Sequence, residues 1–322
     1  MISFQPVYIP ILIPYITFKK SILSPLQLSE ELRIMEIDLN EINIIGAGIM
    51  RPEGVVVQND GTVLAADARG HIARISPDGK TSFYGDVGGT PNGICLDGEG
   101  NCIIANIGNG RCQSLGRDGT HTVLLTEVKG KRIPTPNFPF VDSKGRLWIS
   151  NSSYREDIED AIQNPAPDGC IVLIEKGRAR IVTEGIYFAN GVALNADESK
   201  LYVAATMQRV VLQYKIETDG SLTSPEVYGP SPLAELGYPD GIAFDEAGNL
   251  WVTFPTWNAI GFITPEGELV MVLEDPRGMI LKRPTNICFG WKNLETAFIG
   301  SLDGTGIPNF RTPYPGMKLI HQ

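Results

Sequence analysis

The feature that most constrains the fold of this chain is a short phrase that recurs along it. In its clearest copy, Tyr238 to Val252 (YPDGIAFDEAGNLWV), a turn precedes a short apolar strand, a second turn and another strand. Each copy opens on one polar residue, and the six are Glu53, Asn92, Asn137, Asn190, Asp240 and Asn286. Subtraction of successive positions gives spacings of 39, 45, 53, 50 and 46 residues. A period of about 40–50 residues, rich in short strands, is typical of propeller blades.

The turns and strands inside each copy predict four strands per blade. The internal turn is rich in Asp, Asn and Gly, as at 245–248 (DEAG), and these residues favour tight hairpins. Third strands are predicted at 71–75, 171–175, 210–215 and 259–263. We therefore predict an all-β fold, a six-bladed β-propeller with four-stranded blades around a central channel. A β-sandwich is the alternative, but it would not require the same phrase six times.

The regular pattern begins near residue 43. Residues 43–322 are predicted to form one propeller domain, and residues 1–42 an N-terminal extension of uncertain order. The apolar run at 7–16 contains two prolines and is far shorter than the ~20 residues that span a bilayer. Lys19 and Lys20 follow the run, which is the wrong order for a secretory signal. We expect a cytoplasmic protein without a membrane span, either a monomer or a weak homo-oligomer.

The composition narrows the class of partner. A formal net charge of −10 argues against nucleic acid, because binding to phosphate backbones requires basic surface. The five cysteines are an odd number and form no C-x-x-C pair, so neither a zinc site nor a disulfide framework is predicted. We expect mainly buried, reduced cysteines. A small-molecule substrate is the expected partner.

The polar residues that open the copies are candidates for a functional site. The first strand of each propeller blade runs alongside the channel, so these six side chains are predicted to converge on the axis. Asn-Gly and Asp-Gly are also common turn pairs, and that alternative accounts for Asn92, Asn190 and Asp240. It accounts for neither Glu53 nor Asn137, and an oxygen-lined axial site accounts for all six.

Two carboxylates and several amides suit a hard divalent cation. Ca²⁺ is the expected ion, with Mn²⁺, Mg²⁺ and Zn²⁺ as alternatives. Zinc prefers His or Cys ligands, but His71, His121 and His321 all lie away from the axial positions and are interpreted as structural or exposed. Glu53 and Asp240 carry two negative charges, enough to balance one such ion.

Five short motifs occur in a fixed order along the chain: PEG at 52–54, TPN at 135–137, ANGVAL at 189–194, YPDGI at 238–242 and PYPGM at 313–317. Their arrangement resembles the gluconolactonase/regucalcin family of senescence marker proteins, which are six-bladed propellers with one catalytic divalent metal ion. The resemblance covers roughly residues 51–319. It implies that Glu53, Asn190 and Asp240 are the core metal ligands. It further implies that Asn137 is a ligand or a substrate contact, and that Asp240 is also the catalytic acid/base.

These residues suit the opening of a lactone or related ester. A metal ion polarises the carbonyl, and Asp240 takes a proton from the attacking water and returns it to the ring oxygen. Ester hydrolysis by a serine nucleophile is excluded because the sequence contains no G-x-S-x-G motif. We therefore predict a metal-dependent, gluconolactonase-like hydrolase.

The residues predicted to line the substrate site depart from the pattern of the family. Many members have Asn-Asp at the third blade, often with Arg just before it, whereas here Phe138 follows Asn137 and the preceding residues are Thr135 and Pro136. This predicts a substrate less polar than a free aldonolactone. An acidic insertion at 154–169 is predicted to be either a solvated loop or a lid at the rim. The predicted substrate-binding residues are Asn92, Thr135, Phe138, Tyr187, Tyr238 and Asn286.

Two other functions remain open. A propeller of this type can catalyse bond formation or elimination in biosynthesis, because one fold hosts varied chemistry. Relatives resembling strictosidine synthases work without a metal, so the intact set of Glu53, Asn190 and Asp240 counts against that version. The third possibility is a non-catalytic calcium-binding or ligand-binding propeller.

Overall fold

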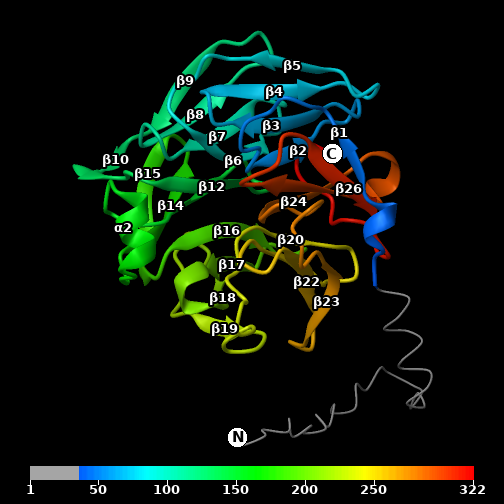
Figure 1. The fold of residues 1–322 in the computed structure, drawn as a ribbon. Coiled ribbons are helices and arrows are strands. Elements are labelled where there is room, and N and C mark those ends of the chain that lie inside the picture. Colours follow the sequence, from blue (N-terminus) through cyan, green and yellow to red (C-terminus); the bar gives the residue numbers. More distant parts are fainter. Residues whose placement is uncertain (1–35) are drawn as a thin grey trace, which may run out of the picture. The chain divides into compact units, whose positions relative to one another are not determined.

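The computed structural model describes residues 36–322 and confirms the predicted all-β propeller. Six four-stranded antiparallel sheets follow one another along the chain, and Figure 1 shows them arranged around a centre. The innermost strands are β2 (Val55–Val57), β6 (Pro91–Leu96), β12 (Pro136–Val141), β16 (Ala189–Leu194), β20 (Ile242–Phe244) and β24 (Pro284–Gly290). The second strands are β3 (Val63–Asp67), β7 (Cys102–Asn106), β13 (Leu147–Asn151), β17 (Lys200–Ala205), β21 (Leu250–Phe254) and β25 (Thr296–Ser301).

The outer strands include all four predicted third strands. The third strands are β4 (His71–Ile75), β8 (Arg111–Leu115), β14 (Gly169–Glu175), β18 (Val210–Lys215), β22 (Ala259–Ile263) and β26 (Ile307–Arg311). The fourth strands are β5 (Thr81–Tyr84), β9 (His121–Leu125), β15 (Arg178–Ile186), β19 (Glu226–Tyr228), β23 (Leu269–Glu274) and β1 (Asn43–Ile45). Strand β1 pairs with β26, so the sixth blade combines the beginning of the pattern with its end and closes the ring.

Few helices interrupt the strands. They are η1 (Leu39–Glu41), α2 (Ile158–Gln163), η2 (Thr206–Gln208) and η3 (Lys292–Leu294), and a small hairpin joins β10 (Glu127–Val128) to β11 (Lys131–Arg132). Within residues 36–322 no helix has the length and apolar character needed to cross a membrane. Of the predicted N-terminal extension, residues 1–35 lie outside the described residues. Further along it, the backbone N–H of Ile37 donates to Val272 of β23.

The turn between the first two strands is fixed by an aspartate in the third and fifth blades. In the fifth blade Asp245 accepts hydrogen bonds from the backbone of Asn249 and from the indole Nε1 of Trp251, at 2.9 Å each. Asp142 accepts equivalent bonds from Arg146 and Trp148 in the third. The predicted Asp/Asn/Gly turns therefore form hairpins whose side chains also anchor a buried tryptophan. The second strands provide the core, because every residue of β3, β7, β13 and β21 is buried.

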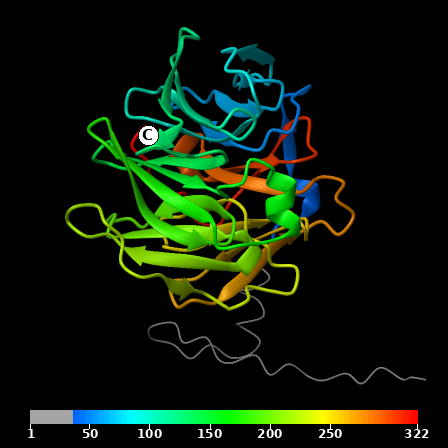
Figure 2. The same cartoon turned by 90° about the vertical axis from the view of Figure 1, so that its left-hand side faces the viewer.

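The C-terminal segment closes one end of the channel. The backbone N–H of Met317 donates to Phe244 O, and Gln322 Nε2 donates to Phe289 O. His321 Nε2 lies 3.2 Å from Val57 O. These carbonyls belong to β20, β24 and β2, at the ends of three innermost strands, so the segment crosses the axis there. Figure 2 shows the C-terminus and the green helix α2 on opposite faces of the propeller.

The environment of His321 predicts a pH-dependent stability. Burial lowers the pKa of His321 to about 4, although its contact with Val57 raises it. The folded state therefore keeps this ring neutral, while the unfolded chain takes up a proton below its ordinary pKa of about 6.5. Stabilisation is complete above that value and is lost as the pH falls toward 4. From pH 7.5 to pH 5 we expect a loss of about 1–2 kcal/mol after allowing for partial exposure of the ring.

Urea denaturation of wild type and His321→Gln at both pH values measures this effect. The variant should lose less stability on acidification than the wild type, by that same amount. His121→Gln, a change at an exposed strand position, is the control and should follow the wild type. Equal acid sensitivity of all three proteins would contradict the assignment.

Candidate active site at the channel mouth

The six predicted axial residues lie at the start of the innermost strands. Asn92 is followed by Gly93 between the paired positions Pro91 and Ile94, where β6 contains one residue more than its partner β7. Similar irregularities occur at Asn137, Asn190 and Asn286. An extra residue in one strand bends it and redirects a side chain, and such bulges are common beside active sites. All six axial side chains are buried.

The glycines that follow the axial residues are required by packing between blades. A Cβ on Gly93 would lie 2.5 Å from Asn137 O of the next blade, and one on Gly241 would lie 2.4 Å from Thr285 O. None of Gly54, Gly93, Gly191 and Gly241 has the positive φ of a turn glycine. Asn92 and Asn190 lie inside strands β6 and β16. The alternative that these pairs are turns is therefore wrong.

Hydrogen bonds connect the axial residues of the first three blades. Arg51 Nη1 donates to Asn92 Oδ1 at 3.1 Å, and Asn92 Nδ2 donates to Asn137 Oδ1 at 3.2 Å. Asn137 Nδ2 in turn donates to Ser152 Oγ at 2.9 Å, and that hydroxyl donates to Ala189 O of the fourth blade. The amide of Asn137 is thus held from both sides, with its oxygen toward Asn92.

In the fourth blade a hydroxyl group takes the place that Ser152 has in the third. Asn190 Nδ2 donates to Thr206 Oγ1 at 3.3 Å, and this hydroxyl donates to Pro239 O beside Asp240. Because its nitrogen is used there, the amide oxygen of Asn190 is left available as a ligand. Asn286 Oδ1 accepts from the backbone N–H of Val55, and Asn286 Nδ2 is buried without a partner among residues 36–322.

The two axial carboxylates repel each other. Burial raises the pKa of Asp240 well above its usual range, and the negative charge of Glu53 raises it further. The charges of Arg51 and Arg283 and a hydrogen bond from Asn190 act in the opposite direction. Glu53 Oε2 forms an ion pair with Arg51 Nη2 but has no well-directed hydrogen bond from the described residues. Two buried carboxyl groups therefore lie on the axis, and of the two only Glu53 forms an ion pair in the described part of the chain.

These residues fit a divalent cation that prefers oxygen. Within residues 36–322 no group of three His, Cys, Asp or Glu side chains is placed to hold a metal ion, so a cation also requires amide ligands. Glu53 and Asp240 provide charge, and Asn190 provides an amide oxygen whose nitrogen is already bonded. Such a mixture of carboxylate and carbonyl oxygens suits Ca²⁺.

The predicted substrate-contact residues differ in their surroundings and in whether their polar groups are already bonded within the protein. The hydroxyl of Thr135 is buried and donates to Ser153 O, so it is already used by the protein. Phe138 lines an axial cavity, whereas Tyr187 and Tyr238 are half-buried in loops, with Arg209 lying over the ring of Tyr238. Contact of these residues with a substrate remains a prediction.

The axial cavity lies between the polar ring and the C-terminal segment. It encloses about 60 Å³ and is lined by residues from all six innermost strands together with Met317 and Leu319. Its wall is mainly aliphatic and aromatic, with Asn286 as the axial residue that reaches it. The polar ring therefore faces the opposite end of the channel, which is the mouth.

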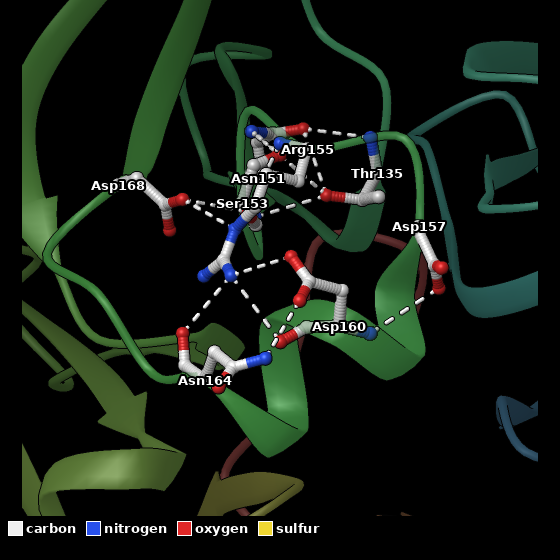
Figure 3. A network of polar contacts seen from close by, with 8 residues as sticks. All are labelled: Thr135, Asn151, Ser153, Arg155, Asp157, Asp160, Asn164 and Asp168. Atoms are coloured by element: carbon white, nitrogen blue, oxygen red, sulfur yellow. Dashed lines mark hydrogen bonds and ion pairs between the residues drawn. The ribbon is translucent and has the colours of Figure 1, made fainter.

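The insertion at 154–169 lies at this same end, because the start of β12 pairs with the end of β13, where the insertion begins. Figure 3 shows the bonds that hold it in place. Arg155 Nε donates to Asp168 Oδ2, and its Nη1 donates to Asp160 Oδ2 and Asn164 O, each at 2.9 Å. Asp157 accepts backbone hydrogen bonds at the start of α2. The insertion is thus a braced part of the rim, and its role as a lid remains a prediction.

The arginines of the site were not predicted from the sequence. Arg51 contacts two axial residues, and Arg283 is close enough for its charge to act on Asp240. A signal for both was present, since the pair Arg-Pro opens the first blade at 51–52 and the sixth blade at 283–284. Ser152 and Thr206 were also missed, because hydroxyl groups after second strands carry no sequence signal of their own.

Comparison with known proteins shows the family of this chain. A family described as the SMP-30/gluconolactonase/LRE-like region matches residues 51–303. A gluconolactonase of Zymomonas mobilis is 28% identical over 295 residues, covering 81% of this chain and 78% of that protein. The strictosidine synthase-like 6 protein of Arabidopsis thaliana is 28% identical over 231 residues, and the match covers 68% of this chain and 60% of that protein.

A solved structure shares the fold. The structure of a gluconolactonase from Xanthomonas campestris superposes with a TM-score of 0.69 at 19% identity, covering 83% of this chain and 88% of that one. At this identity the likeness shows the propeller fold alone.

Proposed function

Because this chain belongs to the SMP-30/gluconolactonase/LRE-like family, we propose that it is a metal-dependent hydrolase that opens a lactone or a related ester. The single observation that carries the proposal is the buried pair of carboxylates on the propeller axis, Glu53 and Asp240, with the oriented amide of Asn190 beside them. Similarity to the gluconolactonase of Zymomonas mobilis supports the reaction class.

Glu53, Asn190 and Asp240 would hold the metal ion, with Asn137 as a further ligand or a substrate contact. A divalent cation held there would polarise the lactone carbonyl and offset the negative charge that develops on its oxygen. Asp240 accepts the proton of the attacking water and returns it to the ring oxygen as the ring opens. Arg51, Asn92 and Asn137 hold the neighbouring polar groups in fixed orientations, so little reorganisation is needed during the reaction.

A panel of lactones in a pH-stat tests the proposal. Wild-type protein is assayed with Ca²⁺, Mn²⁺, Mg²⁺ or Zn²⁺, and with excess chelator. We expect hydrolysis that is lost with chelator and restored by at least one of these ions. Undiminished hydrolysis in chelator would overturn the metal mechanism, and no hydrolysis under any condition would overturn the proposed activity.

Glu53→Gln tests the metal site independently of turnover. The change keeps the shape of the side chain and removes one of two ligand charges, so we expect about 100-fold weaker cation binding. Calorimetric titration and the metal-induced rise in Tm measure this loss. Glu295→Gln, which alters a partly exposed carboxylate paired with Arg311, should bind the ion like the wild type. Unchanged affinity in Glu53→Gln would place the ion elsewhere.

A second candidate function is bond formation or elimination without a metal. The similarity to strictosidine synthase-like proteins favours it, although this chain spans only about three-fifths of their length. This second function predicts that the protein hydrolyses no lactone and that chelator does not slow the bond formation or elimination that it catalyses. Tight metal binding without turnover would instead favour a calcium-binding or ligand-binding propeller.

A further inference from the structure

Two arginines at the channel mouth share an unusual local structure. Arg51 and Arg283 each precede a proline, and their φ angles are 51° and 56°. This left-handed region is rarely adopted by residues other than glycine, and a following proline also restricts the backbone. Each pair opens the innermost strand of its blade, directly before Glu53 and before Asn286.

The two arginine loops are attached to each other through the end of β25. The backbone N–H of Ser301 donates to Pro52 O at 2.8 Å, and that of the next residue, Leu302, donates to Arg283 O at 3.1 Å. Consecutive residues of one strand end therefore hold both loops. The loops that carry the arginines of the first and sixth blades are in this way fixed on the same side of the mouth.

The two guanidinium groups are only partly used by the protein. Arg51 is 27% exposed and bonds Glu53 and Asn92. Arg283 is 52% exposed, and its contact with Asp303 is 3.9 Å long between two exposed groups. A pair of that kind contributes little, so the Arg283 guanidinium can change partner at small cost.

The charges at the mouth do not balance once the proposed metal ion is present. Glu53, Asp240 and Asp303, the partner of Arg283, carry three negative charges, and Arg51 and Arg283 carry two positive ones. A divalent cation adds two positive charges and leaves an excess of one. A neutral lactone offers no charge to offset this excess, whereas a substrate with an anionic substituent does.

We propose that the substrate is a lactone that carries a carboxylate, sulfonate or phosphate group, bound by Arg283 together with Arg51. The planar fork of a guanidinium matches anions that present two oxygen atoms. This inference rests on the proposed lactonase function and specifies its substrate class. The residues on either side of Asn137 predicted a less polar substrate, and the two arginines point instead to a charged group on the side of the first and sixth blades.

A matched pair of substrates tests the inference. D-Glucaro-1,4-lactone and D-glucono-1,4-lactone differ by a carboxylate in place of a hydroxymethyl group. We expect wild type to have a kcat/KM at least tenfold higher for the glucarolactone. Arg283→Gln should lower kcat/KM for this substrate by about 10- to 100-fold, mainly through KM, as the loss of a charge-assisted hydrogen bond predicts. Arg311→Gln, a change at an exposed surface arginine, should match the wild type.

Binding of the open-chain acids provides a readout without turnover. Calorimetry compares submillimolar D-glucarate with D-gluconate, on Ca²⁺-loaded and chelator-treated protein. D-Glucarate should bind Ca²⁺-loaded wild type at least tenfold more tightly, and Arg283→Gln should remove this difference. Hydrolysis of both lactones with no preference for the acidic one, and equal binding of the two acids, would overturn the inference and leave the lactonase proposal standing. Tighter binding of D-glucarate without any hydrolysis would support the anion site while overturning the lactonase.

Discussion

Asp240→Asn is expected to lower kcat/KM for lactone hydrolysis by about 10³-fold, because the variant retains the shape of the side chain but cannot accept a proton. The amide still offers one oxygen to a metal ion, so the loss of activity should exceed the loss of metal affinity. Steady-state rates in the pH-stat at saturating metal measure the first, and calorimetric titration of the ion measures the second.

The same variant should fold at least as stably as the wild type when no metal is present. Asp240 is only 9% exposed, and the charge of Glu53 opposes its ionisation, so a neutral amide removes an unfavourable charge. Thermal unfolding in chelator checks this. Asp86→Asn, a change at an exposed carboxylate between β5 and β6, serves as the matched control for activity. Full activity of Asp240→Asn at saturating metal would rule out Asp240 as the acid/base.

The architecture and the axial positions could be predicted from the sequence because both leave periodic traces. Six copies of one phrase predicted six blades, and oxygen-bearing residues at the same place in every copy predicted convergence on the axis. Cations from the loops could not be predicted in this way. Arg51 reaches Glu53 and Asn92 because its backbone adopts a left-handed conformation, and residue type alone does not indicate such a turn.

The closure of the channel by the C-terminal segment was also not predictable. Residues 317–322 (MKLIHQ) show no alternation and no repeat, and their bonds go to carbonyls at the ends of three separate strands. Contacts of this kind depend on the finished ring of blades. The burial of His321 follows from the same long-range packing, so its lowered pKa has no local cause in the sequence.

The glycines after the axial residues show how a correct pattern can have a different physical cause. Asn-Gly is a strong turn signal, yet here these pairs lie in innermost strands where the backbones of neighbouring blades approach closely. Local propensity alone would place Asn-Gly in a turn. Here glycine is needed because the close packing of neighbouring blades leaves no room for a side chain. A substitution can separate the two causes.

Gly93→Ala is expected to destabilise the protein by about 3 kcal/mol or more and to lower Tm by about 6–12 °C. The new methyl group would lie 2.5 Å from Asn137 O, a backbone atom that cannot move without displacing the third blade. The matched control is Gly145→Ala in the hairpin between β12 and β13, where φ is +73° and no atom lies within 4 Å of the added carbon. There only the left-handed backbone is penalised, by about 1–2 kcal/mol. Chemical denaturation of both variants measures which substitution lowers the free energy of unfolding more. A turn role for Asn92-Gly93 requires Gly93→Ala to cost no more than Gly145→Ala, whereas close packing of blades around the site requires it to cost clearly more.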